Sequence, residues 1–122
     1  MRKATPKETE KFKKIRGKKA MFHITKTILD KHIQDANRAI CEALKESNII
    51  NYEHLGLGEK KIFKGRFKGQ RSQDVNISCY RANGRGDKRI WFKGIAEISQ
   101  PDDMMALSIH ADKITIHNLT GE

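Results

Sequence analysis

The spacing of hydrophobic residues changes from a helical to a strand-like period partway along the chain. Between residues 27 and 47, apolar side chains recur at intervals of three and four positions, at Leu29, Ile33, Ala36, Ile40, Ala43 and Leu44. This spacing predicts one long amphipathic helix, with Thr27 as its N-cap and Ser47 at its end. The apolar stripe covers about two and a half heptads, which favours a helix facing a core over a coiled-coil seam.

Beyond residue 58 the apolar period becomes two, which is typical of strands with one buried face. The pattern predicts four to five strands, at residues 60–68, 74–82, 88–98, 104–109 and 113–119. Short turns rich in Gly, Asn, Asp and Pro separate them. We therefore expect an α+β fold, with the long helix packed on one side of an antiparallel meander sheet.

The first twenty residues have a different composition. Apart from Phe12 and Ile15 they hold little apolar material, and they carry nine Lys or Arg against two Glu. Such a segment cannot bury enough surface to fold alone, so we expect a flexible basic arm over residues 1–20 that becomes helical on binding. Residues 21–122 are then expected to form a single domain.

The chain of 122 residues has 25 Lys and Arg against 15 Asp and Glu, a formal net charge of +10. The sequence has no apolar run long enough to cross a membrane and no apolar segment after its basic start, so we expect no membrane partner and a cytoplasmic location. Cys41 and Cys79 are too few and too far apart for a disulfide scaffold and are expected to be free thiols.

The positive charge is concentrated in two blocks. Residues 1–20 and 59–98 each carry a net charge of +7, whereas residues 21–58 carry −1 and residues 99–122 carry −3. Localised positive charge is the electrostatic footprint expected for a protein that binds nucleic acid. A lysine-rich solvated surface is the alternative interpretation.

Alternation within the strands places basic and aromatic residues on the face opposite the apolar residues. The nucleic-acid contacts predicted on this face are Lys64, Arg66, Lys68, Tyr80, Arg89, Trp91 and Lys93. Further contacts are predicted in or beside the turns, at Arg71, Arg85 and Lys88. Basic side chains meet phosphates and exposed rings stack on bases, although Trp91 packed inside the core is the alternative. The Gly84–Gly86 turn either enters a groove or is an ordinary hairpin turn.

These features favour a small nucleic-acid-binding protein, with DNA slightly preferred over RNA as its partner. No cofactor or metal is expected, because the sequence lacks a Cys-x-x-Cys pair, a His-Glu-x-x-His motif and a phosphate-binding loop. A metal-dependent nuclease is also disfavoured, since Glu97 is not followed by the lysine that such sites need.

Two alternative functions remain open at this stage. A metal-independent endoribonuclease of the small toxin type would use His110 and His117 as base and acid, beside Lys93 or Arg89. A small adaptor or inhibitor of a nucleoprotein complex would bind a protein partner through the polar face of the helix or the acidic residues 99–122.

Overall fold

The computed structural model describes residues 3–68 and 75–120. The described helices are α1 (Pro6–Lys13), α2 (Lys26–Lys31) and α3 (Arg38–Glu46), with 3₁₀ turns η1 (Tyr52–His54) and η2 (Ile95–Glu97). The described strands are β1 (Lys18–His23), β2 (Lys60–Phe67), β3 (Val75–Arg81), β4 (Lys88–Phe92), β5 (Met104–His110) and β6 (Lys113–Asn118). Among the described residues, none of the helices has the length and apolar character needed to cross a membrane.

The fold is α+β, as expected, but the sheet is not an antiparallel meander. Its strand order is β1-β5-β6-β2-β3-β4, and β2 runs parallel to β6. The strand predicted at 88–98 ends at Phe92, because Gly94 takes a left-handed φ of 85° and turns the chain into η2. Alternation of side chains fixes which face a residue occupies, but it does not record which strands are neighbours.

The helix predicted over 27–47 is wrong, because the structure has two helices with an extended segment between them. α2 ends at His32, whose φ of 56° is left-handed. Gln34 and Ala36 then bond to β4: the Ile90 N–H donates to the Gln34 carbonyl over 3.0 Å, and the Ala36 N–H donates to a β4 carbonyl over 2.9 Å. This segment covers the edge of β4, which would otherwise expose unpaired backbone groups.

Side-chain caps set the helix ends. Thr25, and not the predicted Thr27, caps α2 by accepting a hydrogen bond from the Ile28 N–H over 3.2 Å. Asn37 caps α3 by accepting from the Ile40 N–H over 2.8 Å. α3 ends at Ser47, as the sequence predicted.

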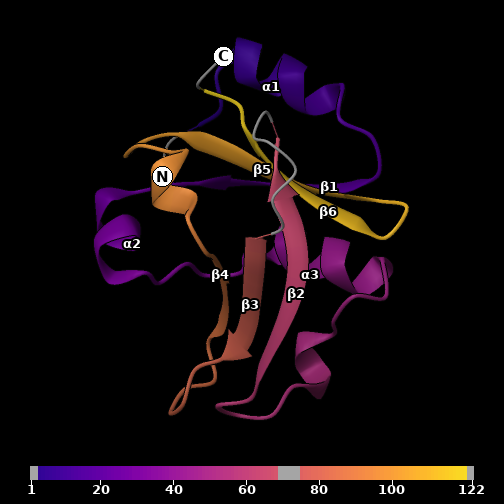
Figure 1. The fold of residues 1–122 in the computed structure, drawn as a ribbon, viewed down its shortest axis with the longest axis vertical. Helices are drawn as coiled ribbons and strands as arrows, with labels where there is room; N and C mark the ends of the chain where they lie inside the picture. The colour runs from indigo at the N-terminus through magenta and orange to yellow at the C-terminus, as the bar shows by residue number, and fades with distance from the viewer. Residues whose placement is uncertain (1–2, 69–74, 121–122) are drawn as a thin grey trace.

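The residues expected to form a flexible arm include α1 and the start of β1, so a boundary at residue 20 falls inside a strand. Phe12 and Ile15 pack with β1 and β5 in a small apolar cluster around Met104, Ala106 and Leu119. Figure 1 shows α1 above the β1–β5–β6 part of the sheet and α3 below it.

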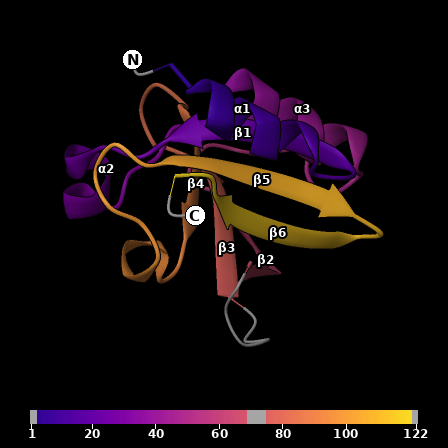
Figure 2. The same cartoon turned by 90° about the horizontal axis from the view of Figure 1, so that it is seen from above.

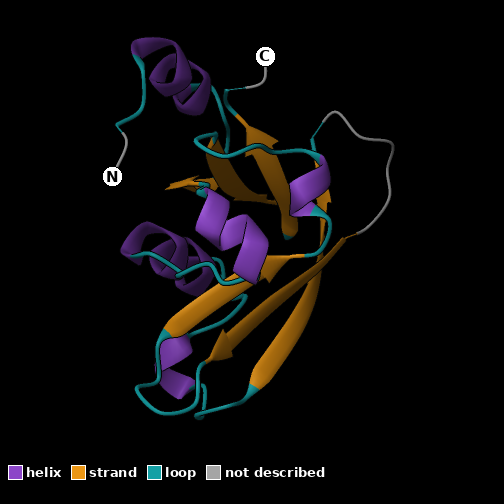
Figure 3. Cartoon of the chain, turned by 90° about the vertical axis from the view of Figure 1, so that its left-hand side faces the viewer, coloured by secondary structure: helices purple, strands orange, loops and turns teal. Residues whose placement is uncertain are grey.

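The sheet is strongly curled. Its β5–β6 hairpin runs across the direction of β2, β3 and β4, as Figure 2 shows from above. Phe22 on one edge strand stacks on Phe92 of the other, with ring centroids 5.4 Å apart, so the two edges approach each other across the main core. α3 lies on this inner side, where Ile40 and Leu44 are fully buried, and Figure 3 shows the helices on one side of β2 and β3. The opposite side of β2, β3, β4 and β6 is called here the outer sheet face.

Candidate nucleic-acid interface

Strand register defines which side chains share the outer sheet face. Its strand residues are Lys60, Ile62, Lys64, Arg66, Asn76, Ser78, Tyr80, Arg89, Trp91, Lys113, Thr115 and His117. None of these residues is acidic. The register thus places the cations of β2 and the rings of Tyr80 and Trp91 on one face of the described strands, although Trp91 also packs against the core.

The predicted cations of β2 are exposed. Lys64 Nζ donates to Asn76 Oδ1 over 2.6 Å, which holds the ammonium group above the neighbouring strand. Arg66 is exposed and has no ion-pair partner within residues 3–68 and 75–120. Lys68 follows the end of β2 and Lys93 follows the end of β4, and both side chains are exposed. Together with exposed Lys60, these four residues form the positive part of the face at β2 and β4.

The two aromatic residues are half-buried, and each already has one neighbour. The Trp91 ring stacks on His32, with centroids 5.0 Å apart and planes inclined by 23°. Lys60 Nζ lies 5.7 Å from the centre of the Tyr80 ring. Trp91 also packs against the main core, so it is neither wholly inside nor a free stacking platform. His32 was missed from the sequence because the predicted helix placed it within α-helical structure.

Backbone pairing aligns the outer sheet face into three rows that cross β2, β3 and β4. The Lys60 row contains Lys60, Tyr80 and Arg89. The Ile62 row contains Ile62, Ser78 and Trp91. The Lys64 row contains Lys64, Asn76 and Lys93, whose N–H donates to the Asn76 carbonyl over 3.0 Å. Successive rows are two residues apart along each strand, or roughly 7 Å.

Two of the predicted contact residues form ion pairs with acidic side chains of the chain itself. Arg89 keeps 24% of its side chain exposed, and its guanidinium lies 3.4 Å from the Asp87 carboxylate. Lys88 points to the opposite side of β4, where its ammonium lies 2.7 Å from Glu53. The hydrogen bond and charge of Lys88 hold the pKa of Glu53 below its ordinary value. The structure therefore does not bring Lys88 to the outer sheet face.

The β3–β4 turn is anchored to its own strands. Gly86 is buried, and its carbonyl accepts a hydrogen bond from Arg81 Nε over 2.9 Å. Arg85 is 91% exposed at the tip, 4.0 Å from Asp87. This geometry fits an ordinary hairpin turn with one exposed arginine. The predicted contact at Arg71 lies outside the described residues.

The residues of the alternative ribonuclease set lie apart. His117 pairs across the hairpin with Ala106, and His110 pairs with Lys113, so the two histidines are four positions apart along β5, or roughly 13 Å. His117 Nε2 shares a hydrogen bond of 2.8 Å with Ser108 Oγ, and burial together with the charge of Lys68 lowers its pKa to about 4. Lys93 follows β4, three strands away from β6.

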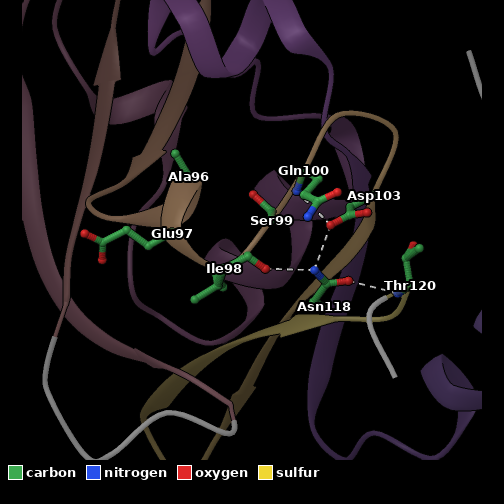
Figure 4. Close-up of a pocket in the computed structure, with 8 residues that line it drawn as sticks. All are labelled: Ala96, Glu97, Ile98, Ser99, Gln100, Asp103, Asn118 and Thr120. Carbon is green, nitrogen blue, oxygen red and sulfur yellow. Dashed lines mark hydrogen bonds between the residues drawn. The ribbon is translucent and has the colours of Figure 1, made fainter.

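A pocket between η2 and the ends of β5 and β6 has a different chemistry (Figure 4). It is lined by Ala96, Glu97, Ile98, Ser99, Gln100, Asp103, Asn118 and Thr120. The Asn118 side-chain amide donates to the Ile98 carbonyl and to the Asp103 carboxylate, each over 2.9 Å. Asn118 and Asp103 are thus bonded within the pocket, and the carboxylates of Glu97 and Asp103 disfavour a phosphate ligand.

Neither thiols nor metal ligands form a site in the described part of the chain. Cys41 and Cys79 are free, as predicted, and burial raises the pKa of both, that of Cys79 to about 11. Within residues 3–68 and 75–120, no group of three or more His, Cys, Asp or Glu side chains is placed to hold a metal ion.

No protein-family model, curated protein or solved structure matches this chain. The chemical character of the outer sheet face is exposed positive charge on β2, beside half-buried rings on β3 and β4.

Proposed function

We propose that this chain is a small nucleic-acid-binding protein, and that its outer sheet face contacts the phosphate backbone. One observation carries the proposal: Lys64 and Arg66 are exposed side by side on a face whose described strand residues include no carboxylate. A solvated sheet face needs no such separation of charge, whereas a surface that meets a row of phosphates does.

The proposed contacts are made to phosphate and not to the 2′-hydroxyl that distinguishes RNA, so DNA provides everything that they need. DNA is therefore the first ligand to test and RNA of the same sequence is the second. Lys68 and Lys93 extend the positive surface beyond the strand ends, and Arg85 extends it along the β3–β4 turn.

The test compares two double variants of equal net charge. Lys64→Gln with Arg66→Gln removes two cations from the outer sheet face, and Arg38→Gln with Lys45→Gln removes two exposed cations from α3 on the inner side. Binding of a labelled oligonucleotide is measured by fluorescence anisotropy over a series of salt concentrations. We expect the first double variant to lower the slope of log affinity against log salt by about 2, and the second to leave it unchanged.

Equal losses in the two double variants would mean that only net charge matters and that the outer sheet face has no special role. Binding that does not weaken with salt would contradict phosphate contacts altogether.

A further inference from the structure

The middle row of the outer sheet face differs from the rows on either side of it. Ile62 keeps 59% of its side chain exposed although it lies between Lys60 and Lys64 on the same face of β2. Its row partners Ser78 and Trp91 carry no charge either. Along β2, a row without charge therefore lies between two rows that begin with a lysine, and successive rows are roughly 7 Å apart.

The Ile62 row offers no binding energy to a phosphate, because it contains no cation. It does offer binding energy to a nucleobase, which is planar, uncharged and gains free energy when its faces leave water. Resting on the proposed function, we propose that the ligand is a single strand of nucleic acid. One base packs on Ile62 beside Trp91, and phosphates of the neighbouring nucleotides lie at Lys60 and Lys64, two row steps apart.

The neighbours of the two rings define where the base lies. His32 covers one face of Trp91, and the Lys60 ammonium stands beside Tyr80, so neither ring offers an open stacking surface on that side. Ser78 is the small residue between Ile62 and Trp91, and it leaves room between their larger side chains. The base is therefore received by the exposed Ile62 side chain, with the two rings at its edges.

A duplex fits this surface poorly. Its bases are paired and stacked, and a protein reaches them only through a groove. The sheet curls toward its core, as the stacking of Phe22 on Phe92 requires, so the outer sheet face is the convex side and offers no projecting strand. The β3–β4 turn is held back by the bond from Arg81 to the Gly86 carbonyl.

The experiment uses three ligands with the same number of phosphates: an oligothymidylate, an abasic oligomer and a hairpin duplex, each of about twenty nucleotides in total. Trp91 is the single tryptophan of the chain and reports contact at the Ile62 row through its fluorescence. We expect the oligothymidylate to change the Trp91 emission and to bind more tightly than either other ligand.

A matched pair of variants isolates the apolar contact. Ile62→Ala removes the proposed base contact, and Leu57→Ala removes an equally exposed side chain, at 60%, from the loop before β2. Because both side chains are exposed, neither truncation opens a cavity, which circular dichroism verifies. We expect Ile62→Ala to weaken oligothymidylate binding about fivefold and to leave abasic binding unchanged, whereas Leu57→Ala changes neither.

The outcomes separate the two proposals. Abasic and thymidylate oligomers that bind equally, with Ile62→Ala without effect, would overturn the base contact and leave the phosphate-binding face intact. Tighter binding of the duplex would overturn the single-strand assignment. Failure of all three ligands to bind, at low as well as high salt, would remove the proposed function and this inference together.

Discussion

His117 lies on the outer sheet face, but its position makes it neutral rather than part of the positive surface. Burial, with a smaller contribution from the charge of Lys68, lowers its pKa to about 4, and it bonds to Ser108. In the unfolded chain the pKa of histidine is about 6.5. Between these two values the unfolded chain binds more protons than the folded one, so the free energy of unfolding falls as the pH falls from about 6.5 to about 4.

We therefore expect His117→Gln to weaken the pH dependence of stability. Urea unfolding at pH 7 and at pH 4.5 gives the change in the free energy of unfolding between the two pH values. The carboxylates contribute equally in the protein and in the variant, so the difference between the two changes isolates His117. Exposed His110 provides the control, as His110→Gln alters no buried group. A His117→Gln variant that loses as much stability between the two pH values as the protein itself would contradict this account.

Single residues show how far the sequence specifies the candidate site. The outward position of Lys64, Arg66 and Trp91 follows from a period of two, which any strand with one buried face imposes. The pairing of Lys88 with Glu53 does not follow, because η1 and β4 lie 35 residues apart and meet only through the fold. Whether a basic residue is available to a ligand depends on such neighbours.

At the scale of elements, Lys19 ties α1 to the sheet. Its ammonium donates to the carbonyls of Phe12, Lys13 and Ile15, at 2.8, 3.3 and 3.1 Å. It also lies 4.8 Å from the centre of the Phe12 ring. The last carbonyls of a helix have no partner within it and carry partial negative charge, so a fixed cation there stabilises the helix end.

We expect Lys19→Met, which keeps the length of the side chain, to loosen α1 without unfolding the sheet. Hydrogen exchange of the amides in residues 6–15 should accelerate about tenfold, which corresponds to the loss of roughly one charged hydrogen bond. The neighbouring Lys18 points to the other side of β1 and pairs with Glu46 on the surface, so Lys18→Met is the control. Equal acceleration in both variants would show that Lys19 has no specific role at the helix end.

Elements were predicted unequally well for a physical reason. The bounds of β2 and β3 agree with their predicted ranges to within one residue at each end, because alternating burial and turn residues are local signals. The break between α2 and α3 and the parallel pairing of β2 with β6 are not local. The break depends on the edge of β4, and the parallel pairing depends on β6, and both strands lie far along the chain from their partners.

At the scale of the whole molecule, the sheet consists of two antiparallel sets that meet along one parallel seam. β1, β5 and β6 form one set, and β2, β3 and β4 form the other. Among the described residues, Gly65, Arg66 and Phe67 of β2 pair with β6, and the Lys68 N–H donates to the Ile116 carbonyl over 2.9 Å. A Cβ atom at Gly65 would lie 3.0 Å from the Ile114 carbonyl oxygen of β6 and 2.5 Å from the end of the Ile77 side chain of β3, so glycine lets β2 pass closely between its two neighbours. Seam pairing alone is too short to couple the two sets, and a shared core must do so.

The shared core is the reason to expect one unfolding transition. Phe92 is fully buried and stacks on Phe22, so truncating it removes contacts of both strand sets at once. We expect Phe92→Ala to lower the free energy of unfolding by about 3–5 kcal/mol, with the Trp91 fluorescence and far-ultraviolet circular dichroism transitions remaining coincident. Phe12→Ala is the matched control, since Phe12 belongs to the separate cluster under α1 and its loss should speed hydrogen exchange mainly in that helix. Transitions that separate in Phe92→Ala would mean that the two strand sets fold independently, and that the outer sheet face is built by β2, β3 and β4 without the rest of the core.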